Sequence, residues 1–228
     1  MTERLWDVIG KREGLLKVSG LCGILGPVIA FTCVGVAVYY SPWFSWTENW
    51  LSDLGGTAGE KPIWAAHGIA SVIFNVGLII TGIIGIVFAI GIRKSGMLNT
   101  HLGRLGTLFL LLNMSALCGV GIFPETTGYL HTLVSLVFFS LVPLSLLSIG
   151  TVVRKSSEKT LGWLTTPLGV ISLCSFPVLF IPRPWGSNAV AEMVPSIAIS
   201  IFSIMFSIRL LKAGLSLKDI NMGTADKE

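Results

Sequence analysis

Long blocks of apolar residues, separated by short polar segments, dominate the pattern of this chain. A helix needs about 20 consecutive apolar residues to cross the hydrocarbon core of a bilayer. Backbone groups in lipid must hydrogen-bond within their own segment, so each block is predicted to be a transmembrane helix. The predicted spans cover residues 18–40, 66–92, 105–123, 131–153, 161–181 and 188–208. The pattern therefore predicts an all-α fold, a polytopic bundle of six transmembrane helices.

Polar segments flank this predicted transmembrane domain of residues 18–212. Residues 1–17 form a basic leader, which either lies on the inner membrane surface or is flexible. Residues 213–228 form a polar tail. Both segments are predicted to be cytoplasmic, on the charge pattern described next.

The basic residues are distributed very unevenly. Fourteen of the 16 Lys and Arg fall in the two terminal segments and in the loops after the second and fourth spans. Only Lys61 and Arg183 fall on the other side. Since basic residues accumulate on the cytoplasmic side, we predict a protein of the cell membrane with both termini in the cytoplasm. The excess of basic residues then reflects topology and contact with anionic lipid headgroups. No patch has the density of basic residues that binding to a nucleic-acid backbone requires.

Composition supports a membrane protein and excludes several other classes. Hydrophobic residues make up 52% of the chain and charged residues 12%, whereas soluble domains have about 25% charged residues. A soluble enzyme, a disulfide scaffold and a disordered chain are thereby excluded. The four cysteines all lie within spans and are interpreted as small buried apolar residues.

The outer loop of residues 41–64 is the longest, and it has a helical pattern. One face carries Trp43, Trp46, Trp50 and Leu54. Another face carries Glu48, Asn49, Ser52 and Asp53. The pattern predicts a short amphipathic helix within 41–56 at the membrane interface, with the tryptophans toward lipid and Asp53 toward the protein. Five of the seven tryptophans, Trp185 included, belong to outer segments, which is typical of an interfacial anchoring belt.

Polar residues on the outer side form a candidate site. Its members are Glu48, Asn49, Ser52, Asp53, His67, Glu125, His131 and Glu192. An ionisable group near a span is costly unless it faces a partner or a polar cavity. Glu125 and His131 can pair across one turn, and Asp53 would complete an acid–His–acid set suited to general acid–base chemistry or to a divalent cation. A structural network, a polar ligand site and a catalytic centre all remain open.

No motif of a metal or cofactor site, such as H-E-x-x-H, occurs in the chain. We therefore predict neither a metal nor a cofactor.

Small and amide side chains within the spans predict how helices pack. Small residues recur in Gly77, Thr81, Gly85 and Ala89, and in Gly20, Gly23 and Gly26. They predict close packing between neighbouring helices or between two copies of the chain. Asn75 and Asn113 are expected at comparable depth in antiparallel helices. An Asn–Asn bond, an Asn–backbone bond and a ligand contact are the alternatives.

Several of these elements resemble one known family. They are Asn49-Trp-Leu-Ser-Asp-Leu-Gly55, Phe74-Asn-Val-Gly-Leu78, Phe123-Pro-Glu125 with His131, Gly26-Pro27 and Arg104. The chain is similar from about residue 15 to 212 to domain of unknown function 998, a family of six-helix membrane proteins from archaea and bacteria. Ser52, Asp53 and His131 also resemble, more distantly, the DRAM-like membrane proteins, some of which are linked to autophagy or lipid-anchor remodelling. That second resemblance implies a role related to lipids.

Three functions follow as hypotheses. The first is a non-catalytic membrane protein that binds a lipid headgroup or small polar ligand on its outer face, alone, with a membrane-protein partner or as a homo-oligomer. The second is a lipid-modifying hydrolase or transferase that uses Asp53, Glu125 and His131. The third is a small-solute transporter, for which Asn75 and Asn113 are the only candidate polar groups near the midplane.

Overall fold

The computed structural model describes residues 2–178, 181 and 189–225. Arg183, Trp185 and the predicted start of the sixth span at 188 lie outside these residues. Within them, six α-helices and two short 3-10 helices form. Their bounds are α1 Thr2–Tyr39, η1 Leu51–Gly55, α2 Ile69–Lys94, α3 His101–Ile122, η2 Glu125–Thr127, α4 Tyr129–Val153, α5 Lys159–Val178 and α6 Ala189–Ala225.

Each of the six α-helices contains a stretch long and apolar enough to cross a membrane. These stretches are Gly10–Tyr39, Ile69–Lys94, His101–Ile122, Tyr129–Val153, Lys159–Val178 and Ala189–Ser216. The prediction of an all-α protein with six transmembrane helices is confirmed. The protein is therefore a multi-pass membrane protein.

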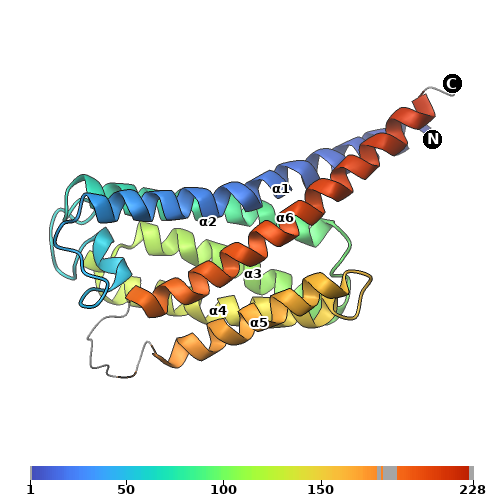
Figure 1. Cartoon of the computed structure of the whole chain (residues 1–228). Coiled ribbons are helices and arrows are strands. Elements are labelled where there is room, and N and C mark those ends of the chain that lie inside the picture. Colours follow the sequence, from blue (N-terminus) through green and yellow to red (C-terminus); the bar gives the residue numbers. More distant parts are fainter. Residues whose placement is uncertain (1, 179–180, 182–188, 226–228) are drawn as a thin grey trace.

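The first and last helices are longer than the predicted spans. Helix α1 already begins at Thr2, and α6 continues to Ala225. These extensions run side by side away from the rest of the bundle (Figure 1). A close approach at Gly214 permits this, since a Cβ there would lie 2.8 Å from the Lys17 side chain. The predicted leader and tail are thus continuations of helices over their described residues.

The six helices form a closed ring in chain order. Each α-helix packs on the next one, and α6 closes the ring against α1. Both termini lie at one end of the bundle, on the right in Figure 1, which we call the terminal end. The loops of residues 40–68 and 123–128 lie at the opposite end, which we call the loop end.

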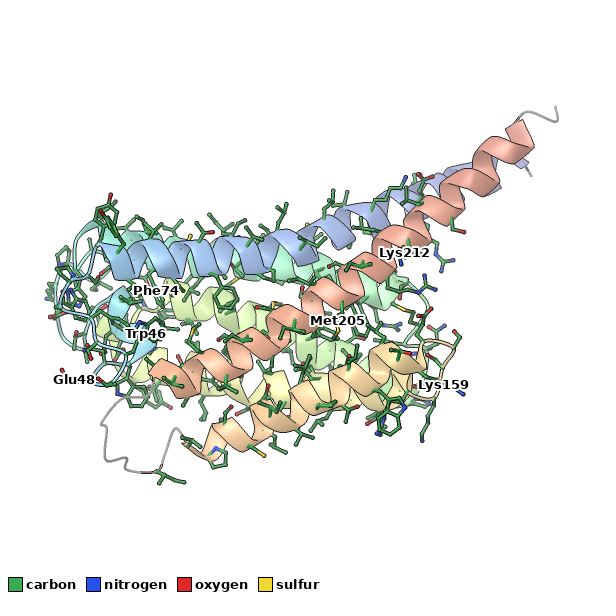
Figure 2. All side chains as sticks on the ribbon, viewed as in Figure 1. Trp46, Glu48, Phe74, Lys159, Met205 and Lys212 are labelled. Carbon is green, nitrogen blue, oxygen red and sulfur yellow. The ribbon has the colours of Figure 1, made fainter. Side chains whose placement is uncertain are left out.

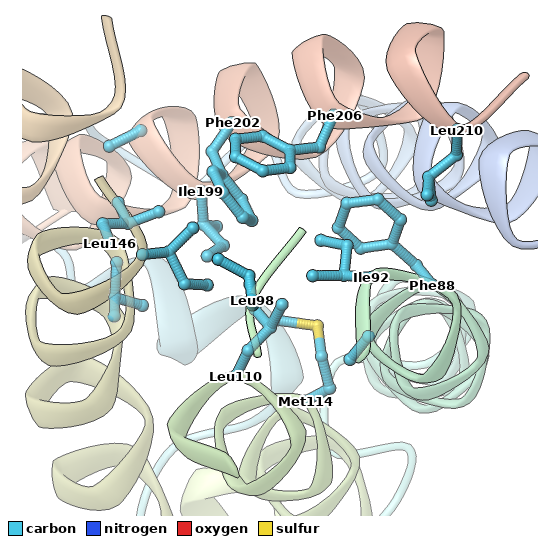
Figure 3. Packing of buried hydrophobic residues seen from close by; sticks show 14 of the residues in the cluster. Phe88, Ile92, Leu98, Leu110, Met114, Leu146, Ile199, Phe202, Phe206 and Leu210 are labelled. Carbon is cyan, nitrogen blue, oxygen red and sulfur yellow. The ribbon is translucent and has the colours of Figure 1, made fainter. Parts of the chain in front are cut away.

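The hydrophobic core lies mostly toward the terminal end. Phe88 of α2 packs edge-to-face on Phe202 of α6 with ring centroids 6.1 Å apart, and Phe206 follows at 4.4 Å from Phe202. Ile92, Leu98, Leu110, Leu146 and Leu210 surround them (Figure 3). Phe88 is 2% exposed, and each of the other side chains is at most 1% exposed. These side chains fill the interior of the bundle toward the terminal end.

Small residues permit close contacts between helices within one chain, as predicted. Gly77 of α2 lies against Cys33 of α1, and Gly85 lies against Met114 of α3. A Cβ at either glycine would come within 2.6 Å of its neighbour. Association of two copies stays a prediction.

The two asparagines are buried, but they do not lie at the same depth. Asn75 lies beside Gly121, because a Cβ on this glycine would be 2.4 Å from the Asn75 carbonyl oxygen. Asn113 precedes Gly121 by about two turns, roughly 12 Å of α3. The expectation of comparable depth is therefore wrong, because α2 and α3 are offset along their axes. Asn113 Nδ2 donates to the Phe138 carbonyl at 2.7 Å, and Asn75 Nδ2 donates to the Gly55 carbonyl at 3.0 Å.

Residues 41–56 do not form the continuous amphipathic helix that their pattern predicts. They form turns followed by the five-residue η1. In an α-helix the N–H groups of Trp50 and Leu51 would bond carbonyls four residues earlier. Here carboxylates accept them instead, Asp53 Oδ2 at 2.9 Å from Trp50 N and Glu192 Oε2 at 2.6 Å from Leu51 N. Side-chain carboxylates thereby replace the backbone carbonyls that would accept these two N–H groups in an α-helix.

The side chains of this loop follow the predicted division only in part, because Leu54 of the tryptophan face is buried and Glu48 of the acidic face is exposed. Trp43, Trp46 and Trp50 are 41–42% exposed, whereas Asp53 is 8% exposed. Trp46 and Glu48 lie at the loop end, far from Lys159 and Lys212 at the terminal end (Figure 2).

Candidate functional site

Three carboxyl groups meet beneath the surface of the loop end. Asp53 belongs to η1, Glu125 to η2 and Glu192 to the first turn of α6. Asp53 and Glu192 are 8% and 6% exposed. The 2.6 Å bond from Leu51 N–H to Glu192 Oε2 joins residues 141 positions apart and ties η1 to α6. Long-range contacts of this kind hold the acidic residues together.

Glu125 has the most unusual environment of the carboxyl groups outside the spans. Burial disfavours its charged form and raises its pKa to about 7, a hydrogen bond from Ser52 opposes this shift, and nearby Asp53 reinforces it. Its Oε2 atom is buried and has no hydrogen-bond partner among the described residues. At neutral pH this carboxyl therefore readily changes its protonation state, and one of its oxygens is buried without a partner in the described part of the chain.

Asp53 is better provided with donors. Its Oδ2 accepts from Trp50 N at 2.9 Å and from Asn49 Nδ2 at 3.2 Å. Asn49 is held in turn by the Ser45 N–H, which donates to its Oδ1 at 2.8 Å. These bonds hold the Asp53 carboxyl beside Glu125, whose pKa it helps to raise.

His131 stands in the first turn of α4 and is 7% exposed. Its Nδ1 lies 2.8 Å from the Phe123 carbonyl oxygen, which only accepts, so Nδ1 carries the hydrogen. In the neutral ring Nε2 is then the acceptor. Ser135 Oγ lies 3.2 Å from Nε2, and its hydroxyl donates the hydrogen. The ring nitrogens thus bond Phe123 and Ser135, rather than Glu125 as the sequence suggested, because the turn after α3 presents its carbonyl to Nδ1.

A cavity of about 350 Å³ opens at this cluster, and we call it the polar cavity because carboxyl, imidazole and hydroxyl groups interrupt its otherwise largely apolar wall. Its lining includes Ser52, Glu125, His131, Ser135, Phe139 and Glu192, and no Lys or Arg among the described residues. An apolar cavity of about 120 Å³ lies next to it, between the helices, and extends to Phe74, Phe88 and Met114. Ser52, Ser135, Phe139 and Glu192 line both cavities. The polar cavity therefore adjoins an apolar one inside the bundle.

The predicted candidate residues are divided by the structure. Ser52, Glu125, His131 and Glu192 line the polar cavity, while Asn49 and Asp53 lie behind this lining. Glu48 is exposed and His67 belongs to a separate cluster, with Nε2 3.2 Å from Glu60 Oε2 and its ring 4.4 Å from that of Trp43.

Sequence reasoning missed Ser135. The signal was present, because His131 and Ser135 are four residues apart and therefore share one face of a helix. Within the described ranges, no group of three or more His, Cys, Asp or Glu side chains is placed to hold a metal ion.

Comparisons with known proteins give one match. The family model described as "Protein of unknown function (DUF998)" matches residues 24–209, which is most of the chain and nearly all of the bundle. No curated protein and no solved structure matches the chain.

Proposed function

The chain belongs to this family of membrane proteins of unknown function, and we propose that it binds the headgroup of a lipid in the cavity at its loop end. The observation that carries the proposal is the pair of adjoining cavities. A polar cavity lined by Glu125, His131 and Glu192 suits a headgroup, and the apolar cavity beside it suits part of a hydrocarbon chain. Membrane lipids are thus the proposed partners.

The chemistry of the lining favours a headgroup that donates hydrogen bonds and carries positive charge. Glu125 and Glu192 contribute carboxyl groups, and His131 contributes a ring nitrogen that accepts. No Lys or Arg of the described lining competes for them. A primary ammonium group, as in an ethanolamine headgroup, provides three donors and the complementary charge.

We also propose that the loop end faces the outside of the cell and the terminal end faces the cytoplasm. The support is the uneven distribution of Lys and Arg along the chain. A cysteine-directed reagent that cannot cross membranes should label an Ala58→Cys variant in intact cells and should miss a Ser157→Cys variant. Both positions are exposed in loops at opposite ends. The reverse labelling pattern would overturn the orientation.

Headgroup binding is tested with lipids of known composition. In nanodiscs, phosphatidylethanolamine should raise the melting temperature of the wild-type protein more than phosphatidylglycerol does. Glu192→Gln keeps an acceptor for the Leu51 N–H but removes the carboxyl group that a bound ammonium group would pair with. We expect it to weaken ethanolamine-lipid binding by about tenfold, which corresponds to about 1.4 kcal/mol.

The matched control is Glu48→Gln, an exposed carboxylate at the same end that does not line the cavity. It should leave binding unchanged. Equal losses in both variants, or a preference of the wild type for phosphatidylglycerol, would reject the proposed site.

A further inference from the structure

We propose that Ser135 and His131 form a nucleophile–base pair that hydrolyses a carboxylic ester bond of an amphipathic lipid. The inference rests on the proposed function for the class of substrate, and on the hydrogen bonds around His131 for the chemistry.

The geometry provides the three parts that such a pair needs. A serine nucleophile requires a base within hydrogen-bond reach and a third group that orients the base. Ser135 Oγ is 3.2 Å from His131 Nε2, and the Phe123 carbonyl holds Nδ1–H at 2.8 Å. This second bond fixes the ring and leaves the lone pair of Nε2 directed at the serine hydroxyl.

This hydrogen bond differs from those of other serines in the spans. A serine within a helix usually donates to the carbonyl four residues earlier. Such bonds occur at Ser115, Ser172, Ser196 and Ser200. Ser135 instead pairs with the imidazole of the residue four positions earlier. The hydroxyls of Ser145, Ser175 and Ser203 depart from the four-residue pattern too, but they donate to carbonyls, whereas Ser135 pairs with a ring nitrogen.

The position of Ser135 fits the ester of a lipid. Ser135 of α4 lines both the polar cavity and the apolar cavity, as does Ser52 of η1. The ester of an amphipathic lipid joins its polar part to its hydrocarbon chain. A lipid with its polar end in the first cavity and its chain in the second would place that junction near Ser135.

The reaction balances with water as the co-reactant. Ser135 Oγ attacks the ester carbonyl carbon while its proton moves to His131 Nε2. The carbon–oxygen bond to the alcohol then breaks, and the alcohol leaves with that proton. Water attacks the acyl-serine, gives a proton to Nε2, and releases the fatty acid as Ser135 regains its hydrogen.

Glu125 can assist at the tetrahedral stage. It lines the same cavity, and its unpartnered Oε2 can carry a proton. A carboxylic acid there can donate a hydrogen bond to the oxygen that becomes negative.

The direct test is covalent labelling of the full-length protein in mild detergent. An alkyl fluorophosphonate should form one adduct, which peptide mass spectrometry should locate at Ser135. Ser135→Ala should abolish the adduct, and His131→Asn should slow its formation by about 100-fold or more, because a general base contributes at least that factor. Ser115→Ala is the matched control, a serine that bonds a helix carbonyl, and should label like the wild type.

Each outcome separates catalysis from headgroup binding. Folding of every variant is checked by its melting transition, and the adduct on the wild-type protein is informative by itself. Ethanolamine-lipid binding without an adduct at Ser135 would overturn hydrolysis and leave the binding proposal standing. An adduct that forms equally fast in folded His131→Asn would also overturn the pair. Labelling that depends on His131, without ethanolamine-lipid binding, would reject the headgroup proposal alone.

Discussion

The two ends of the bundle differ in where their ionisable side chains lie and in what these side chains contact. At the terminal end, charged groups remain at the surface and find partners. Arg209 Nε lies 2.6 Å from Glu158 Oε1, and the guanidinium of Arg154 lies 4.7 Å from the centre of the Trp163 ring. Arg12 donates to the Ser95 carbonyl at 3.1 Å. These contacts are typical of the region where helices leave the membrane.

At the loop end, carboxyl groups are buried together. Asp53, Glu125 and Glu192 share one cluster, and the described lining of its cavity has no Lys or Arg. Burying like charges is unfavourable, and such arrangements concentrate at functional sites. The ionisable groups of the terminal end thus lie near the surface with partners, whereas the buried carboxyl cluster of the loop end is a feature that packing alone does not require.

Packing density differs between the two regions as well. Gly23 and Gly26 are one turn apart on α1. A Cβ at Gly23 would lie 2.1 Å from Ser207 Oγ and 2.4 Å from the Phe88 ring, inside the closed core. A Cβ at Gly26 would meet only side chains at 3.8 Å or more, and Gly26 lines the apolar cavity. Helix α1 is thus tightly packed at Gly23, toward the terminal end, and open at Gly26, where it borders the apolar cavity.

The largest effect is expected from adding one methyl group on the filled side. Gly23→Ala should lower the free energy of unfolding by about 3 kcal/mol, because the Phe88 ring must move in a packed core. Gly26→Ala should change it by less than about 1 kcal/mol. Chemical or thermal unfolding of both variants in the same detergent measures the difference. Equal losses would show that the two halves are packed alike.

The second prediction concerns pH. Because the pKa of Glu125 is raised from 4.5 to about 7, the folded protein holds this proton more tightly than the unfolded chain does. Stability should therefore fall as pH rises from about 5 to about 8, and the loss should be complete once Glu125 is charged in the folded state. Each unit of pKa shift is worth about 1.4 kcal/mol, and screening of the partly exposed carboxyl reduces the total to about 2 kcal/mol.

Glu125→Gln isolates this titration, since the amide stays neutral at every pH. The variant should lose the part of the pH dependence that Glu125 causes, as measured by melting temperatures across the range. If the melting temperatures of the wild type and the variant depended on pH in the same way, the raised pKa of Glu125 would be contradicted. Binding of an ethanolamine headgroup should show the opposite trend and strengthen as Glu125 becomes charged.

The spans were predictable because their signal is local. An apolar block of about 20 residues has one favourable arrangement in a bilayer, whatever its neighbours do. The meeting of Asp53 with Glu125 also follows from the sequence, since both residues flank spans on the same side. Topology alone brings them to one end of the bundle.

The remaining features depend on contacts that no local pattern contains. The amphipathic helix predicted within 41–56 is reduced to the 3-10 helix η1, where Glu192, 141 residues beyond Leu51, accepts the Leu51 N–H. The pairing of His131 with Ser135 depends on the Phe123 carbonyl, which selects the ring nitrogen that carries hydrogen. Many span residues are serines, so spacing did not single out Ser135.

The smallest effect is expected at the terminal end, where the charges are exposed and paired. Glu158→Ala removes the partner of Arg209, and both side chains remain 30–37% exposed. A partly exposed ion pair contributes between about 0 and 1 kcal/mol, and salt screens it. Unfolding measurements at low and high salt should show a loss in this range that shrinks as salt is added. A loss of several kcal/mol that salt leaves unchanged would mean that the terminal end, too, depends on desolvated charge, and the contrast between the two ends would no longer hold.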